Sequence, residues 1–331
     1  MSHVPVMLHE VCEVLTLQPG KRIVDGTFGA GGYSRAFLEQ EGVSVLALDR
    51  DPAVKPRAEA LKAAFGERFA FTLTPFSNLE EAAHAHGWAQ AEGVVLDLGV
   101  SSMQIDQPQR GFSFMHDGPL DMRMGKEGPS AADAVNTLDA AGLSAIFRTF
   151  GEEKHARKAA AAIVEERARA PITTTAALAA LLARVLGAGW QKIHPATRVF
   201  QALRIYVNDE LGELARALAA AERLLAPAGR LAVVAFHSLE DRMVKQFLRQ
   251  RAEAPAAPSR HLPGAAAQAF APRFTLPVRK AIRPTAEEIA ANPRARSARL
   301  RFGIRTAAPA LADDRPVFPG IPALESLGAK S

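Results

Sequence analysis

A glycine-rich turn between a short apolar run and a helical pattern constrains the fold of this chain more than any other feature. Ile23 and Val24 are typical of a buried strand, and the run ends at Asp25. Four glycines follow within seven residues, and a helical pattern resumes after Tyr33. In an open parallel sheet, such a strand, turn and helix bring the backbone close to a nucleotide-like ligand, because glycine has no side chain in the way.

A second apolar stretch, 43–48, ends in Asp49 and indicates what kind of ligand the turn accepts. An acidic residue at the end of the second strand suits the two hydroxyls of a ribose. Two features differ from a dinucleotide-binding pattern: Asp25 precedes the glycines, and no helix N-terminus is clearly aimed at a pyrophosphate. The pattern therefore favours S-adenosylmethionine (SAM), which has no phosphate. A turn without a ligand and a nicotinamide-dependent oxidoreductase are the alternatives.

Strand and helix patterns alternate as far as Asp97 and predict an α/β fold with a parallel sheet and right-handed crossovers. No strand pattern occurs over 108–208, where a loop rich in Gly, Pro and Met (110–124) precedes helical patterns over roughly 139–149, 152–169, 174–186 and 195–208. The threonines at 173–175 supply an N-cap for the third of these helices. This segment predicts an inserted helical domain, and a strand pattern returns at 230–236. The remaining predictions are a discontinuous sheet domain over 1–107 and 209–305, antiparallel edge strands at 274–280 and 298–304, a flexible loop over 253–272 and a flexible tail over 306–331.

Composition and charge restrict the partners of the chain. The hydrophobic fraction of 48% and the charged fraction of 23% are ordinary for a soluble globular protein. We find no membrane-spanning stretch and no secretory signal, so we expect a cytoplasmic protein without a membrane partner. The single cysteine, Cys12, excludes an internal disulfide and is expected to be a small core residue. Between Arg260 and Arg305, ten Lys and Arg oppose two Glu, which indicates either a phosphate-binding segment or a solvated basic extension.

Carboxylates follow three of the predicted strands, at Asp25, Asp49 and Asp97. Ligands of open α/β sheets bind at the carboxyl ends of the strands, so we expect a nucleoside-type cofactor at this edge. Phe76 follows the third strand and is suited to stack on a purine. His237 follows the strand at 230–236 and is either a polar turn residue or a participant in the chemistry. No second His or Cys stands at ligand spacing to it, so we expect no metal.

Eight short motifs occur in order along the chain: DGTFG with GG (25–32), LDRDP (48–52), LDLGVSS (96–102), RGFSF (110–114), GPLDMRM (118–124), HPATR (194–198), FHSLEDR (236–242) and NPRARS (292–297). Together they resemble the RsmH family, also called MraW, the bacterial SAM-dependent methyltransferases of 16S ribosomal RNA. The resemblance covers about residues 3–305. It implies a Rossmann-like SAM-dependent methyltransferase sheet with an inserted all-helical domain. It also implies methylation of the exocyclic N4 of cytidine 1402, in the decoding centre of the small ribosomal subunit.

The resemblance also implies which residues bind SAM: Gly31, Gly32, Tyr33, Asp49, Phe76, Asp97 and Gln104. Two positions depart from the family pattern, because Tyr33 stands where His is frequent and Met103 where Pro is common. Backbone contacts at position 33 are expected to persist, whereas a side-chain contact there stays open.

Methylation of a cytosine amino group requires a hydrogen-bond acceptor, because the nitrogen lone pair is delocalised into the ring. Amino-methylating enzymes of DNA often carry an Asp/Asn/Ser-Pro-Pro-aromatic loop after the fourth strand, and this chain has DLGVSS instead. Four candidates for the acceptor stay open: Asp97, Ser101, His237 and Asp241.

The substrate base must also leave its stack, and the surrounding RNA backbone must be held. We expect Arg110, Arg123, Arg198 and the basic stretch 279–305 to do this, with binding that weakens steeply with salt. A non-catalytic ribosome-assembly factor, which would bind rRNA without transferring a methyl group, is the alternative from another class. The sequence does not decide whether the protein forms a homodimer.

Overall fold

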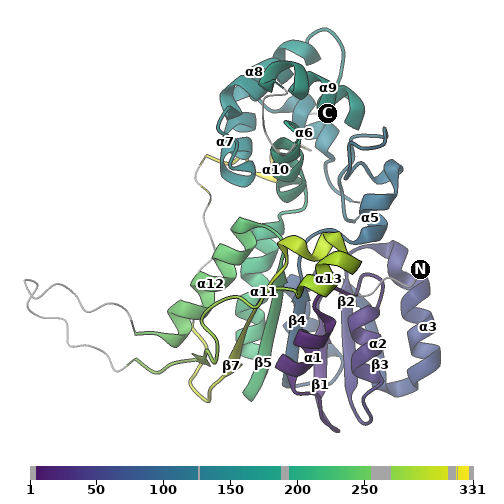
Figure 1. Cartoon of the computed structure of the whole chain (residues 1–331), viewed down its shortest axis with the longest axis vertical. Helices are drawn as coiled ribbons and strands as arrows, with labels where there is room; N and C mark the ends of the chain where they lie inside the picture. Colours follow the sequence, from purple (N-terminus) through teal and green to yellow (C-terminus); the bar gives the residue numbers. More distant parts are fainter. Residues whose placement is uncertain are drawn as a thin grey trace, which may run out of the picture. The chain divides into compact units, whose positions relative to one another are not determined.

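The computed structural model describes residues 5–125, 127–187, 194–254, 270–311, 318 and 320–327. The chain forms two compact units (Figure 1). The sheet unit comprises Met1–Gly99 and Glu213–Arg315, and the helical unit comprises Val100–Gly212 and Pro316–Ser331. The divisions at 99 and 212 lie eight and four residues from those expected at 107 and 208, and the segment after 315 groups with the helical unit.

The sheet unit is built on seven strands in the order β3-β2-β1-β4-β5-β7-β6. The first five strands pair in parallel, and β7 is antiparallel to both β5 and β6. The strand order reverses between β1 and β4, where open sheets of this kind bind ligands. The predicted α/β sheet is confirmed. The strands are β1 Arg22–Asp25, β2 Ser44–Asp49, β3 Phe69–Leu73, β4 Ala91–Asp97, β5 Leu225–Ala235, β6 Phe274–Thr275 and β7 Arg299–Arg305.

One predicted edge strand is much shorter than expected. The strand predicted over 274–280 ends at Thr275, two residues before Pro277. Proline has no N–H to donate to a ladder, which disfavours continuation of the strand.

Three of the helices pack on the sheet through a shared apolar cluster. In this cluster Leu79, Leu218 and Val244 pack with Val94 and Val233 of the central strands. A short helix at 286–291 is absent from the sequence prediction, although Thr285 caps it by accepting a hydrogen bond from the Glu288 N–H at 3.1 Å. The helices are α1 Leu8–Leu15, α2 Gly32–Leu38, α3 Lys55–Phe65, α4 Leu79–Ala85, α11 Glu210–Leu224, α12 Ser238–Ala252 and α13 Ala286–Ala291.

A buried ion pair joins α11 to α12, and a neighbouring hydrogen bond joins α11 to β7. The Arg251 Nε donates to Glu222 Oε2 at 2.6 Å, and the two side chains are 7% and 1% exposed. The Arg305 Nε donates to the Glu222 carbonyl at 2.8 Å, and the Leu311 N–H donates to Glu222 Oε1 at 3.2 Å. The Glu222 side chain and carbonyl therefore hold three separate parts of the sheet unit.

The helical unit contains the four helices that the sequence predicts over 139–208, at slightly different bounds. Thr174 caps α9 as expected, by accepting from the Ala177 N–H at 3.2 Å. A Cβ atom at Gly151 would lie 2.5 Å from the Arg198 carbonyl, so glycine permits α7 and α10 to approach closely. The helices are α5 Ser102–Asp106, α6 Ala131–Thr137, α7 Ala140–Gly151, α8 Ala156–Arg167, α9 Thr175–Leu186 and α10 Thr197–Val207. Nowhere in the described parts of the chain is there a helix with the length and apolarity to cross a membrane.

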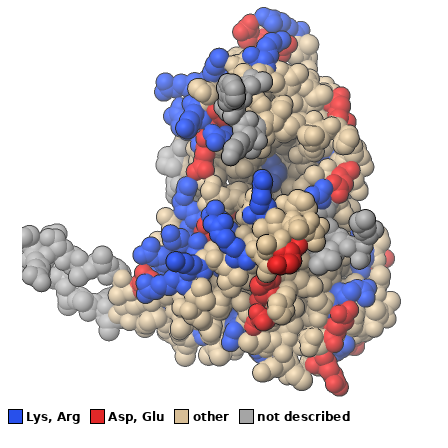
Figure 2. All heavy atoms as spheres, viewed as in Figure 1, with Lys and Arg blue, Asp and Glu red and all other residues tan. Residues whose placement is uncertain are grey.

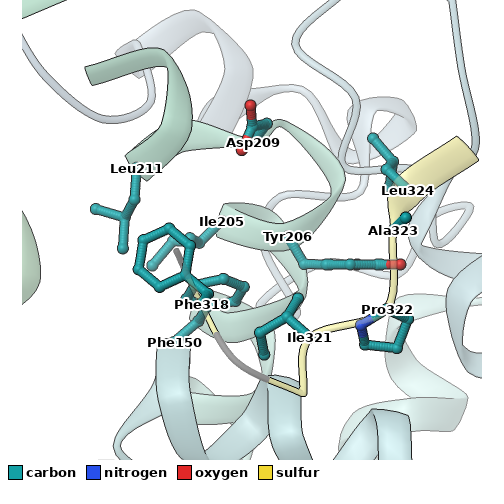
Figure 3. Close-up of a pocket in the computed structure, with 10 residues that line it drawn as sticks. All are labelled: Phe150, Ile205, Tyr206, Asp209, Leu211, Phe318, Ile321, Pro322, Ala323 and Leu324. Carbon is teal, nitrogen blue, oxygen red and sulfur yellow. The ribbon is translucent and has the colours of Figure 1, made fainter. Parts of the chain in front are cut away.

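The described residues of the expected flexible tail, 306–331, contact both units: 306–311 lie on the sheet unit, and 318 and 320–327 group with the helical unit. The ring of Phe318 meets that of Phe150 edge-on, with centroids 5.3 Å apart. Phe318 and Leu324 also line a pocket of about 230 Å³ together with Phe150 and Tyr206 (Figure 3). Apolar side chains explain the docking. Parts of the expected tail and loop lie outside the described residues, namely 312–317, 319 and 328–331 of the tail and 255–269 of the loop.

Candidate active site

The glycine turn between β1 and α2 leaves free space beside the backbone at one glycine, Gly29. Gly29 and Gly31 have φ angles of 54° and 80°, in the left-handed region that side chains disfavour. A Cβ at Gly31 would lie 2.8 Å from the Phe28 ring, and one at Gly32 would lie 2.3 Å from Pro5 Cγ. At Gly29 the nearest atom would be 3.8 Å away. The turn is therefore closed at Gly31 and Gly32 and open at Gly29.

Asp25 fixes the start of this turn from inside the protein. Its carboxylate is fully buried and accepts hydrogen bonds from Ser34 Oγ at 2.6 Å and from the Thr27 N–H at 3.2 Å. Burial is the main cause that raises the pKa of Asp25 to about 6, and the hydrogen bonds oppose it. Asp25 is thus a structural residue of the turn.

We predict that Asp25 makes the ligand-free protein less stable as the pH rises. The native carboxyl keeps its proton to about pH 6, whereas the ordinary value is 3.8. The native state therefore binds more protons between these values, and the free energy of unfolding falls across this range by at most about 3 kcal/mol. Asp25→Asn removes this contribution. Urea unfolding of both proteins from about pH 4 to 7 measures it, and parallel curves would contradict the prediction.

Asp49 combines a structural role with capacity for a ligand. Its Oδ2 accepts from the Gly29 N–H at 2.8 Å, and its Oδ1 accepts from the Asp51 N–H at 2.8 Å. The backbone of Arg50 supplies a third hydrogen bond to this carboxylate. Its two oxygens together accept about four hydrogen bonds, so capacity remains for a further donor, such as a ribose hydroxyl. Burial raises the pKa of Asp49, while the backbone hydrogen bonds favour its charged form.

Asp97 carries a buried oxygen that lacks a partner. It ends β4, and its backbone N–H donates to Thr27 Oγ1 at 2.7 Å. Its Oδ1 is buried and has no hydrogen-bond partner among the described residues. Burial, followed by the charges of Asp25 and Glu240, raises the pKa of Asp97 well above its usual value. An unsatisfied buried polar atom costs about 1–3 kcal/mol, which a donor from a ligand would recover.

The other predicted contacts of the cofactor divide between the two units. Phe76 lies beside the glycine turn, with its Cβ 3.3 Å from the position that a Cβ on Gly26 would take. Gln104 belongs to the helical unit, where its Oε1 accepts from the Ser101 N–H at 2.9 Å. Ser101 Oγ in turn accepts from the Gln104 N–H at 3.2 Å, which caps α5. The roles of Ser101 and Gln104 at a ligand stay predictions.

The Tyr33 side chain points into the protein. It is 3% exposed, and its hydroxyl donates to the Val6 carbonyl. The Met7 N–H donates to Glu288 Oε1 at 2.6 Å, so the N-terminal segment is held from both sides. Because the Tyr33 hydroxyl already bonds to Val6, only the backbone of Tyr33 is expected to contact a cofactor.

His237 is the N-cap of α12, which is consistent with its interpretation as a polar residue of the turn. Its Nδ1 accepts from the Glu240 N–H at 3.4 Å, and Glu240 Oε2 accepts from the backbone N–H groups of Phe236 and His237. Its Nε2 lies 3.1 Å from Glu240 Oε1, at an angle that forms no hydrogen bond. The sequence interpretation did not identify Glu240 as the partner of His237. The spacing of a capping box would have identified it, because in this motif the side chain of the third helical residue accepts a hydrogen bond from the N-cap backbone N–H.

Asp241 is occupied by two arginines. Its carboxylate accepts from Arg299 Nη1 at 2.8 Å and from Arg301 Nε at 2.7 Å. Burial raises the pKa of Asp241, but the hydrogen bonds from Arg301 and Arg299 outweigh burial and lower it below the ordinary value. A carboxylate held in this way is a poor proton acceptor, which favours a structural role for Asp241 over the predicted catalytic one.

The three arginines predicted to hold RNA all donate within the helical unit. Arg110 Nη2 donates to the carbonyls of Arg123 and Met124, each at 3.0 Å. Arg123 forms two hydrogen bonds to Asp121, at 2.7 and 2.9 Å. Arg198 Nη1 donates more weakly to the Glu152 carbonyl at 3.3 Å. Arg110 and Arg123 therefore shape their own loop, and contacts of the three with RNA stay predictions.

Comparison with known proteins agrees with the motifs. Residues 1–305 match the model of a family described as the MraW methylase family. The chain is 55% identical over 328 residues to the Ribosomal RNA small subunit methyltransferase H of Maricaulis maris, covering 99% of this chain and 98% of that protein. It is 54% identical over 327 residues to the protein of the same name from Brucella canis, covering 98% of this chain and 93% of that protein.

A crystal structure of an rRNA methylase from Streptococcus thermophilus aligns with a TM-score of 0.41 and 10% identity over 92% of this chain and 99% of that one. The resemblance seen in the sequence is confirmed, and this chain belongs to the MraW methylase family.

Proposed function

We propose that this protein transfers the methyl group of SAM to the exocyclic N4 of cytidine 1402 in 16S rRNA, within the small ribosomal subunit of the cytoplasm. Membership of the MraW methylase family and the names of the curated relatives support the reaction class and the substrate. The observation that carries the proposal is the buried Asp97 Oδ1, which lacks a partner at the carboxyl edge of the sheet.

The residues at this edge fit SAM. Asp49 keeps acceptor capacity for ribose hydroxyls, and Gly29 leaves backbone open beside it. Asp25 is buried and Asp49 and Asp97 are partly buried, and desolvation raises the pKa of all three, so a positive charge nearby is favourable to them. When bound, SAM supplies an electrophilic methyl group on a positively charged sulfur.

Asp97 is the acceptor for the substrate amino group in this proposal. A hydrogen bond from the N4 amino group to Asp97 Oδ1 withdraws the nitrogen lone pair from the ring and orients it for attack. Transfer would form the nitrogen–carbon bond as the carbon–sulfur bond of SAM breaks, and the methylated amino group would release one proton. A carboxylate with a raised pKa is a stronger base and is suited to receive that proton. Burial also excludes water from the transfer.

Labelled SAM tests the reaction on small ribosomal subunits that lack this modification. We expect label in 16S rRNA, with digestion mapping it to the decoding centre. Label at another nucleotide would contradict the substrate. SAM binding and rRNA binding without transfer would identify the non-catalytic assembly factor. Thermal stabilisation by NAD instead of SAM would identify the oxidoreductase.

A further inference from the structure

The basic C-terminal part of the sheet unit contains two kinds of arginine. Arg299 and Arg301 point inward to Asp241, and Arg305 donates to the Glu222 carbonyl. These three hold the fold together. They are therefore unsuited to bind an external phosphate, although the sequence places them in the same basic stretch.

A second group of basic side chains is exposed. Three of them follow one another on α12 at positions 242, 245 and 249, a spacing that places them on one side of the helix. The acidic residues of the same helix, Glu240 and Asp241, are buried. Helix α12 therefore buries both of its acidic residues and exposes three of its four basic residues, whereas Arg251 is buried. The exposed group, which we name the α12 basic face, consists of Arg242, Lys245, Arg249, Arg279, Lys280 and Arg283.

Two contacts place Arg279, at the start of the segment 279–283, beside α12. Arg301 binds Asp241 of α12 through Nε and donates through Nη1 to the Arg279 carbonyl at 3.3 Å. Arg279 Nη1 also lies 3.3 Å from Glu253 Oε1, at the end of α12. Figure 2 shows Lys and Arg atoms gathered over this part of the sheet unit.

The charges of this face are poorly neutralised. Arg249 and Arg279 share the single carboxylate of Glu253. Lys245, Lys280 and Arg283 form no ion pair with any residue that the structure describes. A patch of like charges that exceeds its nearby counter-ions is the electrostatic pattern of a surface that binds phosphates.

The face also begins at the candidate active site. Helix α12 starts directly after His237, at the end of β5, and β5 pairs with β4, which ends in Asp97. We propose that the α12 basic face binds the RNA phosphate backbone next to the nucleotide whose base reaches Asp97. This inference rests on the proposed function and adds to it the surface that holds the substrate.

The test neutralises the three unpaired charges in the variant Lys245→Gln/Lys280→Gln/Arg283→Gln. The matched control neutralises three exposed charges on α3 of the same unit, Lys55→Gln/Arg57→Gln/Lys62→Gln. Binding to small subunits lacking the modification is measured against salt concentration, together with SAM binding by calorimetry. In the first variant we expect the slope of log K against log salt to become shallower by about two to three units. We also expect its affinity at about 0.15 M salt to fall about 100-fold, while its affinity for SAM stays unchanged.

We expect the control variant to keep the wild-type slope. An unchanged slope and affinity in the α12 variant would overturn the proposed surface while leaving the proposed function in place. A wild-type protein that binds SAM but shows no salt-dependent binding to the small subunit would overturn the proposed substrate, and the surface with it.

Discussion

Asp97→Ala is expected to lower the single-turnover rate of methyl transfer by about 100-fold or more at saturating SAM. In the proposed mechanism Asp97 Oδ1 is the acceptor that orients the N4 amino group, and it has no other partner among the described residues. Loss of one well-placed hydrogen-bonding group in a water-excluded site costs about 10²–10³-fold in rate. Rapid-quench measurements with labelled SAM, on small subunits lacking the modification, give this rate directly.

Two further variants separate the functions of this carboxyl group. Asp97→Asn keeps an acceptor oxygen but is a much weaker base, so we expect its rate to lie between those of the wild type and Asp97→Ala. His237→Ala removes the imidazole that caps α12 and is expected to retain most of the single-turnover rate. SAM affinity is measured for each variant, because Asp97 also lies at the cofactor edge. A wild-type single-turnover rate in Asp97→Ala would refute its role as the acceptor.

Glu222→Ala is expected to lower the free energy of unfolding by about 3–5 kcal/mol. The substitution leaves Arg251 buried without its partner, and an uncompensated buried charge is strongly unfavourable. The Leu311 N–H loses its acceptor as well. Urea unfolding at neutral pH measures the change.

The matched control is a surface ion pair that also involves α11. Arg223 donates to Glu80 at 2.7 Å, but the two side chains are 36% and 22% exposed. Glu80→Ala is therefore expected to cost about 1 kcal/mol or less. Replacing both buried charges, in Glu222→Leu/Arg251→Met, is expected to restore most of the lost stability. Equal losses in Glu222→Ala and Glu80→Ala would contradict this account of the network.

Local sequence patterns predict the acidic edge because strands and their ends are encoded locally. The apolar runs before Asp25, Asp49 and Asp97 predict both the strands and the position of each carboxylate at the end of its strand. A parallel sheet then brings these ends to one edge. The glycine turn is predictable for the same reason, since the φ angles of Gly29 and Gly31 require residues without a side chain.

Contacts between distant residues were not predictable in this way. Asp241 was a catalytic candidate because it follows a strand, whereas its partners Arg299 and Arg301 come from β7, far along the chain. The same limit applies to the C-terminal segment, where Phe318 packs on Phe150. Hydropathy indicates that such residues prefer burial, but it does not identify the surface that buries them.

Short helices were missed for a different reason. Periodicity is weak over five to seven residues, so α5 and α6 leave little signal in the apolar pattern. Their caps were readable, because Ser101 with Gln104 and Ser130 with Asp133 both have the spacing of a capping box.

The position of the transferred methyl group tests the central claim most directly. Small subunits lacking the modification are treated with this protein and SAM, their rRNA is digested to nucleosides, and the methylated nucleoside is identified by mass spectrometry against standards. We predict N4-methylcytidine, derived from position 1402 of 16S rRNA. A methyl group on the ribose or on a ring carbon, or no methylated cytidine while SAM still binds, would contradict the account.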